Sequence, residues 1–397
     1  MEQRRAVVIG AGIGGLAAAV ALRRTGWQVT VLERLQRLDP AGAGLAIAPN
    51  ALRALDRVGV GDQVRALAAA RGDVGLRRPD GRWLSRTSAD AIRTRFGEPM
   101  VVAARSAVVD ALRAVLPTDA VRTGTEVTSV EQGTAGAPAR VTVGDDAPLA
   151  ADLVVAADGL RSAARQAAFP GHAGPRYAGY TTWRWLAPSP GQPYRPAETW
   201  GRGRLFGAMP LVDGRVYCWA SSVAAAGQEY QDDHAELVRL YADWHDPIPA
   251  LVSAARDLTL LRLDIEELPT PLPAYHRDRL ALVGDAAHAM TPFLGQGACQ
   301  AIEDAVTLAA VLGDVPAGAV PAALASYSGT RLPRVTMIAE RSRRVGRLAQ
   351  VTSPLAVLAR DAGLRLADRL VPDLAVRQMV PVVDVEPPAL GSGRLTP

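Results

Sequence analysis

The sequence contains no lysine, and all 44 of its basic residues are arginine. This absence excludes a Schiff-base lysine and the lysine of a nucleotide-binding P-loop. Only two cysteines, Cys218 and Cys299, occur in 397 residues, which is too few for a disulfide framework, so we expect a reducing, cytoplasmic location. No run of 18 apolar residues occurs, so we expect no membrane span. The first apolar stretch is interrupted by glycines and is interpreted as a strand, not a signal peptide.

The charge balance excludes further classes of protein. The net charge is only +4, and the arginines are scattered instead of forming a basic stripe, so we expect no nucleic-acid partner. The five histidines show no metal-ligand spacing, so we expect no metal site. An apolar content of 49% with 21% charged residues is typical of a globular protein, and the length suits one large core or two to three domains.

A glycine-rich turn follows the first apolar run. Residues 6–9 predict a short buried strand, after which Gly10, Gly12 and Gly15 fit the pattern G-x-G-x-x-G. The first glycine permits a tight turn, the second lets the backbone approach a pyrophosphate, and the third lets helix pack on strand. A helical pattern and a second strand then lead to Glu33, about 20 residues on, which can accept a hydrogen bond from a ribose 2′-hydroxyl. These elements together predict a dinucleotide site.

A second strand-loop-helix unit occupies residues 279–309. The apolar run at 280–283 stops at Gly284-Asp285, and a Pro/Gly loop leads to a helical pattern from about Gln296. Asp285 can accept hydrogen bonds from ribityl hydroxyls. The free N–H groups and the positive dipole end of the helix can stabilise negative charge on a reduced flavin. Alone, this unit would equally fit an ordinary strand-loop-helix joint, but together with the dinucleotide site it is suited to the flavin end of the same ligand.

Three motifs in order carry a resemblance to a known family. They are the glycine-rich turn with Glu33-Arg34, the run ADGLRSAAR at 157–165, and the run GDAAHAMTPFLGQG at 284–297. On these residues the chain resembles the single-component FAD-dependent aromatic hydroxylases of the p-hydroxybenzoate hydroxylase fold. It is most similar to the branch with salicylate, 3-hydroxybenzoate and urate hydroxylase-like enzymes. The resemblance covers residues 5–345, and Arg105 matches a helix arginine that reaches FAD in relatives.

The resemblance implies a reaction cycle. FAD is reduced by NADH or NADPH and then reacts with O2 to form a C4a-hydroperoxide, which hydroxylates an aromatic or polyketide-like small molecule. Epoxidation and Baeyer–Villiger insertion would share this flavin chemistry, and a non-oxygenating FAD reductase or cyclase is a further alternative. The run Trp183-Arg184-Trp185 approaches a flavin-dependent halogenase motif, but those enzymes use a lysine, which this chain lacks. A monomer or a homodimer is expected.

The resemblance and the element pattern imply an α/β fold with a discontinuous, Rossmann-like FAD-binding domain, a β-sheet substrate domain and C-terminal helices. We expect the FAD-binding domain to comprise residues 1–73, 101–170 and 273–320. The substrate domain is expected at 74–100 and 171–272, and a helical region with a loose tail at 321–397. Only one dinucleotide fingerprint is present, so no second Rossmann domain for NAD(P)H is expected.

The candidate site residues follow from these motifs. Cofactor contacts are expected from Gly10, Gly12, Ile13, Gly14, Gly15, Glu33, Arg34, Gly44, Leu45, Arg105, Val127, Asp158, Gly284, Asp285, Pro292, Gly295, Gln296, Gly297 and Ala298. Substrate contacts are expected among Trp183, Arg204, Phe206, Met209, Trp219 and Phe293. The period of two puts Arg204 and Phe206 on one face, with Met209 on the other unless Gly207 forms a bulge. No catalytic side chain is assigned, and His288 is equally consistent with a structural role.

Overall fold

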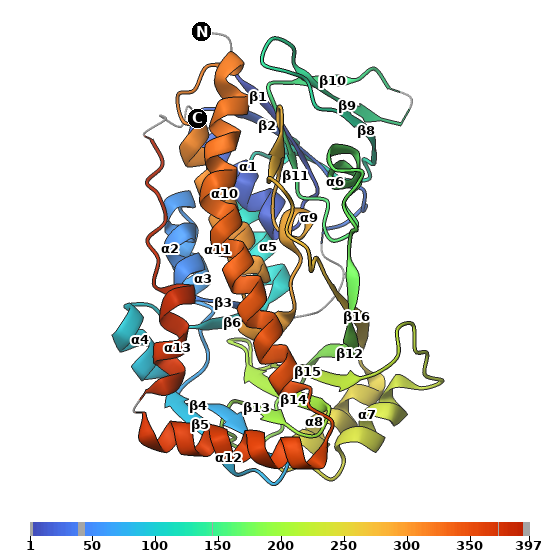
Figure 1. The fold of residues 1–397 in the computed structure, drawn as a ribbon, viewed down its shortest axis with the longest axis vertical. Coiled ribbons are helices and arrows are strands. Elements are labelled where there is room, and N and C mark those ends of the chain that lie inside the picture. Colours follow the sequence, from blue (N-terminus) through green and yellow to red (C-terminus); the bar gives the residue numbers. More distant parts are fainter. Residues whose placement is uncertain (1–2, 39–43, 145, 372, 392–397) are drawn as a thin grey trace.

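The computed structural model describes residues 3–38, 44–144, 146–371 and 373–391. Its first sheet has six strands in the order β17-β18-β11-β1-β2-β7 and lies in the upper half of Figure 1. The strands are β1 Arg5–Ile9, β2 Gln28–Leu32, β7 Val121–Arg122, β11 Leu153–Ala156, β17 His276–Arg277 and β18 Leu280–Leu282. All neighbouring pairs are parallel except β17 with β18.

This first sheet brings three distant segments of the chain together. β1 pairs with β2 on one side and β11 on the other, and β11 pairs with β18. The carboxyl ends of these parallel strands meet at one edge, so the segments that follow Ile9, Ala156 and Leu282 become neighbours there. Ligands of such sheets bind at this edge. The predicted α/β class and the discontinuous nucleotide-binding fold are confirmed.

The second sheet has seven strands in the order β16-β12-β15-β14-β13-β4-β5 and lies in the lower half of Figure 1. Its strands are β4 Asp73–Arg77, β5 Trp83–Ser88, β12 Arg176–Ala187, β13 Ala197–Trp200, β14 Arg204–Pro210, β15 Val216–Val223 and β16 Leu261–Glu267. The pairing is antiparallel except that β13 runs parallel to β4. The segment from Asp73 to Ser88 is therefore an edge of this sheet.

One face of the seven-stranded sheet, called the outer face here, packs on two helices. Trp183, Trp185 and Phe206 lie in a buried cluster with side chains of α7, Asp233–Tyr241, and α8, Ile248–Ser253. Edge-to-face contacts join Trp185 to Phe206 and Phe206 to Tyr241. The opposite, inner face contains Met209, Tyr217 and Trp219. Helices α7 and α8 both lie in the chain between strands β15 and β16.

The remaining elements connect and cover the two sheets. Two small antiparallel sheets are β3-β6 and β8-β9-β10, with strands β3 Gly44–Ile47, β6 Val101–Ala104, β8 Val127–Glu131, β9 Ala139–Val143 and β10 Leu149–Ala151. The other helices are α1 Ile13–Arg24, α2 Pro49–Val58, α3 Gly61–Arg65, α4 Ala89–Phe96, α5 Arg105–Ala114, α6 Ala163–Ala168, α9 Asp285–His288, α10 Gly297–Leu312, α11 Val320–Ala349, α12 Pro354–Leu370 and α13 Leu374–Val383. The long helix α11 passes both large sheets (Figure 1).

The segment after α13 lies along α2. Arg53 of α2 donates hydrogen bonds to the carbonyl oxygens of Val383 and Val385, and Arg57 forms an ion pair with Glu386 at 2.6 Å. The part of the expected loose tail that includes Val385 and Glu386 is therefore held against α2 by these contacts. No helix in the described ranges is long and apolar enough to cross a membrane.

Candidate flavin site and substrate face

The glycine-rich turn has the close contacts that its glycines predict. Gly10 has φ +98°, and a Cβ there would lie 2.4 Å from the Ala157 carbonyl oxygen. A Cβ on Gly15 would lie 1.9 Å from the Gly10 oxygen, so only glycine fits both positions. Helix α1 begins after Gly12 with no capping side chain and no acidic residue in its first turn. Its first N–H groups are therefore available to a pyrophosphate.

Glu33 braces this turn in addition to its expected ribose contact. Its carboxylate accepts hydrogen bonds from the backbone N–H groups of Ala11, at 2.8 Å, and Leu35, at 2.9 Å. The end of β2 is thus tied to the turn that follows β1. Arg105, at the start of α5, also lies at this turn, with its Nη2 atom 3.7 Å from where a Cβ of Gly12 would be. Arg34, which follows Glu33 in the sequence, is exposed.

The second predicted segment has a strained joint at its centre. Gly284 has φ 62° and ψ −138°, a backbone region open mainly to glycine. The turn leaves Asp285 exposed, while the following residues through His288 are buried. Helix α10 begins after Gln296 with no capping side chain and no acidic residue in its first turn. An exposed carboxylate and an open helix N-terminus therefore flank the same loop, which includes Pro292 and Gly295.

A buried carboxylate, Asp304, connects the two ends of this segment. Its Oδ2 atom accepts a hydrogen bond from the Gly284 N–H at 3.0 Å and lies 2.5 Å from His288 Nε2. Its Oδ1 atom accepts from Arg331 Nε at 2.7 Å. Burial raises the pKa of Asp304, but His288 and Arg331 outweigh this effect and lower the pKa to about 2. His288 is therefore a positioning residue within the fold.

Glu303 extends this network to the start of α10. It pairs with Arg331 at 2.6 Å and with Arg334 at 2.7 Å. Although burial raises the pKa of Glu303, these arginines lower it overall. Its Oε1 atom also accepts hydrogen bonds from the amides of Gln300 and Asn50, and both amides donate to Gln296 Oε1 at 3.0 Å. The predicted flavin segment is thus held at both ends.

No sequence motif predicted this buried network. Glu303 and Asp304 are adjacent acidic residues in a helix that is otherwise mostly apolar, and that contrast is a signal for buried ion pairs. Their partner Arg331 is on α11, and no local pattern indicates which arginine of that helix turns inward. From the sequence, only the two adjacent carboxylates could have been predicted to be buried and paired.

The other predicted cofactor residues have mixed environments. Asp158 Oδ2 accepts from the Ala164 N–H at 3.3 Å, whereas its buried Oδ1 has no hydrogen-bond partner among the described residues. Such an unsatisfied oxygen at the edge of the first sheet fits a polar ligand. Gly14 packs on α10, where a Cβ would lie 3.1 Å from Ala301 Cβ. The rest lie on the expected elements, with Ile13 buried and Leu45, Val127, Gly297 and Ala298 half-buried.

The inner face of the seven-stranded sheet is the one that meets the flavin segments. Met209 and Trp219 cluster with side chains of β3 and β6. The Tyr217 ring covers Gly44, because a Cβ on Gly44 would lie 2.3 Å from it. Phe293, from the loop before α10, contacts Tyr180 of β12 with ring centroids 5.5 Å apart. Residues on this face are therefore suited to contact a substrate next to the flavin.

Three predicted substrate residues lie on the outer face instead. Trp183 and Phe206 are buried in the cluster with α7 and α8. Arg204 donates a hydrogen bond to the Leu240 carbonyl of α7, with its guanidinium over Trp244. The strands β14 and β15 pair without a bulge at Gly207, so Met209 faces away from Arg204 and Phe206. Trp183, Arg204 and Phe206 therefore lie on the face opposite Met209 and Trp219, and this placement does not support the expected contacts with substrate.

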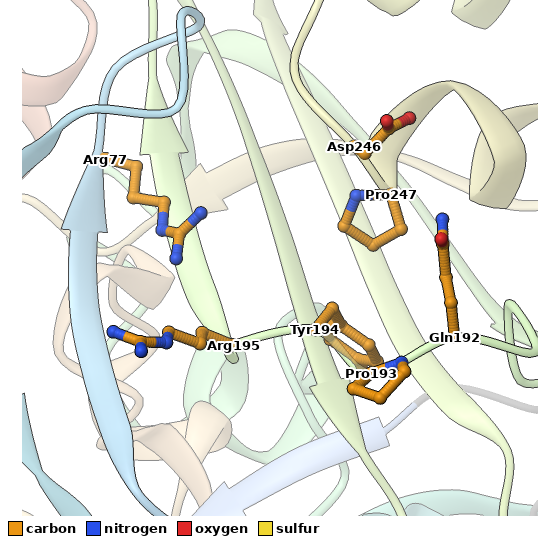
Figure 2. Close-up of a pocket in the computed structure, with 7 residues that line it drawn as sticks. All are labelled: Arg77, Gln192, Pro193, Tyr194, Arg195, Asp246 and Pro247. Atoms are coloured by element: carbon orange, nitrogen blue, oxygen red, sulfur yellow. The ribbon is translucent and has the colours of Figure 1, made fainter.

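An open cavity of about 380 Å³ lies at another place in the second sheet. Figure 2 shows the seven residues that line it, Arg77, Gln192, Pro193, Tyr194, Arg195, Asp246 and Pro247. They come from β4 and from the loops before β13 and α8. None of the predicted cofactor or substrate residues lines this cavity. It is therefore separate from the flavin segments described above.

Comparison with known proteins agrees with this geometry. The family model of the FAD binding domain matches residues 3–186 and 271–342. The aurachin C monooxygenase/isomerase of Stigmatella aurantiaca is 34% identical over 363 residues, covering 91% of this chain and 93% of that protein. An FAD-dependent urate hydroxylase of Klebsiella pneumoniae is 32% identical over 347 residues, covering 86% and 89%.

Solved structures agree as well. Klebsiella pneumoniae HpxO, crystallised with FAD and uric acid, superposes with a TM-score of 0.87 at 28% identity, covering 96% of each chain. Fold and site together define a flavoprotein of the p-hydroxybenzoate hydroxylase fold. The chain belongs to the FAD-dependent aromatic hydroxylase family, and FAD is its cofactor.

Replacing Asp285 should weaken FAD binding more than replacing Glu33. Asp285→Ala removes charge-assisted hydrogen bonds to ribityl hydroxyls, each contributing roughly 1.5–3 kcal/mol. At Glu33, water can substitute at the solvent-facing ribose, so Glu33→Ala should have the smaller effect. Titration of the apo-protein with FAD measures both dissociation constants, with Asp90→Ala as a control at an exposed acid of α4, outside the residues expected to bind FAD. Affinities like wild type in both variants would contradict the assignment of these segments.

Replacing Asp304 should destabilise the fold and weaken FAD binding together. Asp304→Asn removes one partner of a buried ion pair, which typically costs about 3–5 kcal/mol. Because the pKa of Asp304 falls from 3.8 to about 2 in the fold, its ionised form stabilises the protein above about pH 4 and this contribution is lost as the pH falls towards 2. The difference in urea stability between variant and wild type should therefore shrink in acid. Exposed Asp314→Asn is the control, and a pH-independent difference would count against this account.

FAD should be bound non-covalently, because no thiol of the described chain is set up to form a flavin linkage. Burial raises the pKa of Cys299 to about 12 and raises that of Cys218 further, so neither is a thiolate at neutral pH. His288 is engaged by Asp304. Acid precipitation of the yellow protein should release FAD into the supernatant, measured by chromatography. Colour that remained with the denatured pellet would refute this expectation.

Proposed function

We propose that this protein is an NADH- or NADPH-dependent FAD monooxygenase that hydroxylates an aromatic small molecule. The observation that carries the proposal is the joint between β18 and α10. There, exposed Asp285 and the uncapped start of α10 lie on the loop whose Phe293 reaches the inner face of the second sheet. The two relatives described above carry names of enzymes that oxygenate small molecules, one of them urate.

The chain's own residues bind and orient the reactants in this proposal. FAD, when bound, supplies the chemistry that moves one atom of O2 onto the substrate after reduction by NAD(P)H. The open start of α1 binds the pyrophosphate, and Asp285 binds the ribityl chain. The open start of α10 stabilises negative charge on the reduced ring. Trp219, Met209 and Phe293 form apolar walls that exclude water from the reacting atoms.

In this proposal, FAD binding and substrate binding belong to different parts of the chain, each built around one of the two large sheets. Residues 1–73, 101–170 and 273–320 bind FAD, and residues 74–100 and 171–272 bind the substrate. Support comes from the pairing of β4 with β13, which joins the segment near residue 75 to the second sheet. Helix α11 passes both parts and contributes Arg331 to the buried network.

The test is oxygen-dependent turnover. The purified FAD-bound protein should oxidise NADH or NADPH faster in the presence of an aromatic substrate, with one O2 consumed per NAD(P)H. The substrate should gain one oxygen atom, and labelled O2 should deliver that atom while the other leaves as water. Product structure by NMR separates ring hydroxylation from epoxidation or Baeyer–Villiger insertion. Substrate conversion without O2 consumption would replace this proposal with a reductase or cyclase.

A further inference from the structure

Three polar side chains project from the inner face of the second sheet, and the sequence analysis named none of them as a site residue. They are Tyr180, Arg184 and Glu198. Tyr180 and Arg184 are both on β12 and share a face by the strand period of two. Arg184 is paired with Trp219, Trp219 with Gly207, and Gly207 with Glu198 across neighbouring strands. Arg184 and Glu198 therefore stand at the two ends of one cross-strand row.

Tyr180 is buried without a hydrogen-bond partner. Tyr180 is only 4% exposed, and its hydroxyl group forms no hydrogen bond with any described residue. Its ring touches Phe293 of the flavin loop. Burial raises the pKa of Tyr180, to which Glu267 adds, while Arg184 opposes the increase. The hydroxyl is therefore neutral at physiological pH and able to donate a hydrogen bond to a ligand.

Glu198 is a half-buried carboxyl group with no ion-pair partner in the described part of the chain. Burial raises its pKa to about 7, and the neighbouring indoles of Trp219 and Trp200 partly oppose this increase. The flanking residues Leu76, Trp200 and Leu205 belong to an apolar cluster with Phe293. The indoles of Trp219 and Trp200 are neutral donors, and they leave lone pairs of the carboxyl group able to accept a further hydrogen bond from the N–H or O–H of a ligand.

Arg184 is the cationic counterpart at the other end of the row. It is half-buried, and among the described residues it has neither a hydrogen bond nor an ion pair. Its two neighbours, Trp183 and Trp185, point into the outer core, so strand alternation directs the arginine to the flavin side. An arginine stays charged under all physiological conditions and suits an oxygen that carries negative charge.

The sheet surface between Arg184 and Glu198 is covered by the flat indole of Trp219. A Cβ on Gly207 would lie 2.0 Å from two carbons of the Trp219 indole, so the indole lies across the backbone of β14 only because residue 207 is glycine. Arg184 and Glu198 stand three strand spacings apart, roughly 14 Å between backbones at about 4.8 Å per spacing. Strand side chains stand roughly perpendicular to the sheet and can lean along it. The space between the guanidinium group of Arg184 and the carboxyl group of Glu198 therefore suits a planar ligand of one or two rings.

We propose that Arg184 and Glu198 bind opposite edges of the substrate over the Trp219 indole, with Tyr180 as an additional donor. The substrate class that fits is a planar aromatic ring system with an N–H or O–H donor on one edge and a carbonyl or phenolic oxygen on the opposite edge. Glu198 accepts from the donor, and Arg184 binds the oxygen. This inference rests on the proposed function for the location of the flavin, but not on turnover.

The test measures equilibrium binding to the oxidised, FAD-bound protein without NAD(P)H, from the change in flavin absorbance. Three flat two-ring probes separate the two contacts. The first, 4(1H)-quinolone, has both the N–H and the oxygen. The second, 1-methyl-4-quinolone, lacks the donor, and the third, indole, lacks the oxygen. Wild-type protein should bind the first probe about tenfold or more tightly than either of the others, as expected for one charge-assisted hydrogen bond each.

Each variant should lose either the preference for the probe N–H or the preference for the probe oxygen, and keep the other one. Glu198→Leu should bind 4(1H)-quinolone and its 1-methyl derivative alike, and Glu198→Gln should keep the preference because its amide oxygen still accepts. Arg184→Met should bind 4(1H)-quinolone and indole alike. Outer-face Arg204→Met is the matched control and should retain both preferences. A merely structural role would weaken all three probes together.

Several results would overturn the inference. One is that wild-type protein binds none of the probes, or binds all three with equal affinity. Another is that the Glu198→Leu or Arg184→Met variant loses both the preference for the N–H and the preference for the oxygen, or keeps both. Loss of a preference in Arg204→Met but not in Arg184→Met would move the substrate to the outer face. The proposed function fails separately, by lack of O2-dependent NAD(P)H oxidation, and binding preferences that persist in that case still support the contacts.

Discussion

The flavin segment of this protein depends on the buried contacts of one carboxylate. Asp304 accepts a hydrogen bond from the strained turn at Gly284 and pairs with His288 and Arg331. An ionised acid in a dry interior is stable only when charged and hydrogen-bonding partners surround it, and here three elements supply them. The same contacts fix where β18 ends and where α10 begins. The position of the exposed Asp285 and of the open helix N-terminus therefore follows from groups that never meet solvent.

The second constraint is the alternation of side chains along the strands of the second sheet. Adjacent residues face opposite ways, so the run Trp183-Arg184-Trp185 puts two indoles into the outer core and one guanidinium towards the flavin segments. Gly207 adds a local condition, because the absence of its side chain lets the Trp219 indole cover the sheet. One face is thus a conventional core, and the other carries Tyr180, whose hydroxyl has no hydrogen-bond partner among the described residues, and two charged groups that form no ion pair there.

The parts of the fold that the sequence predicted are the ones encoded locally. The glycine-rich turn, the acid that ends β2 and the Gly284-Asp285 joint are short motifs in which neighbouring residues make the structure. They were found in the right order and on the right elements. The faces of the second sheet were harder to predict, because a strand period shows which residues share a face but not which face meets a helix. Phe206 and Arg204 were paired correctly with each other, yet both lie against α7.

The sequence by itself determined the class of fold, FAD as the cofactor and the absence of lysine chemistry, because each rests on residue identity or on motifs of close spacing. Only the tertiary structure decided that Arg331 completes the Asp304 network from a helix 27 residues away. It also decided that Tyr180, Arg184 and Glu198 share the inner face of the second sheet, whereas Trp183, Arg204 and Phe206 lie on the outer face. The physical reason is that burial and unsatisfied hydrogen-bonding capacity are properties of surroundings, which arise only when distant elements pack together.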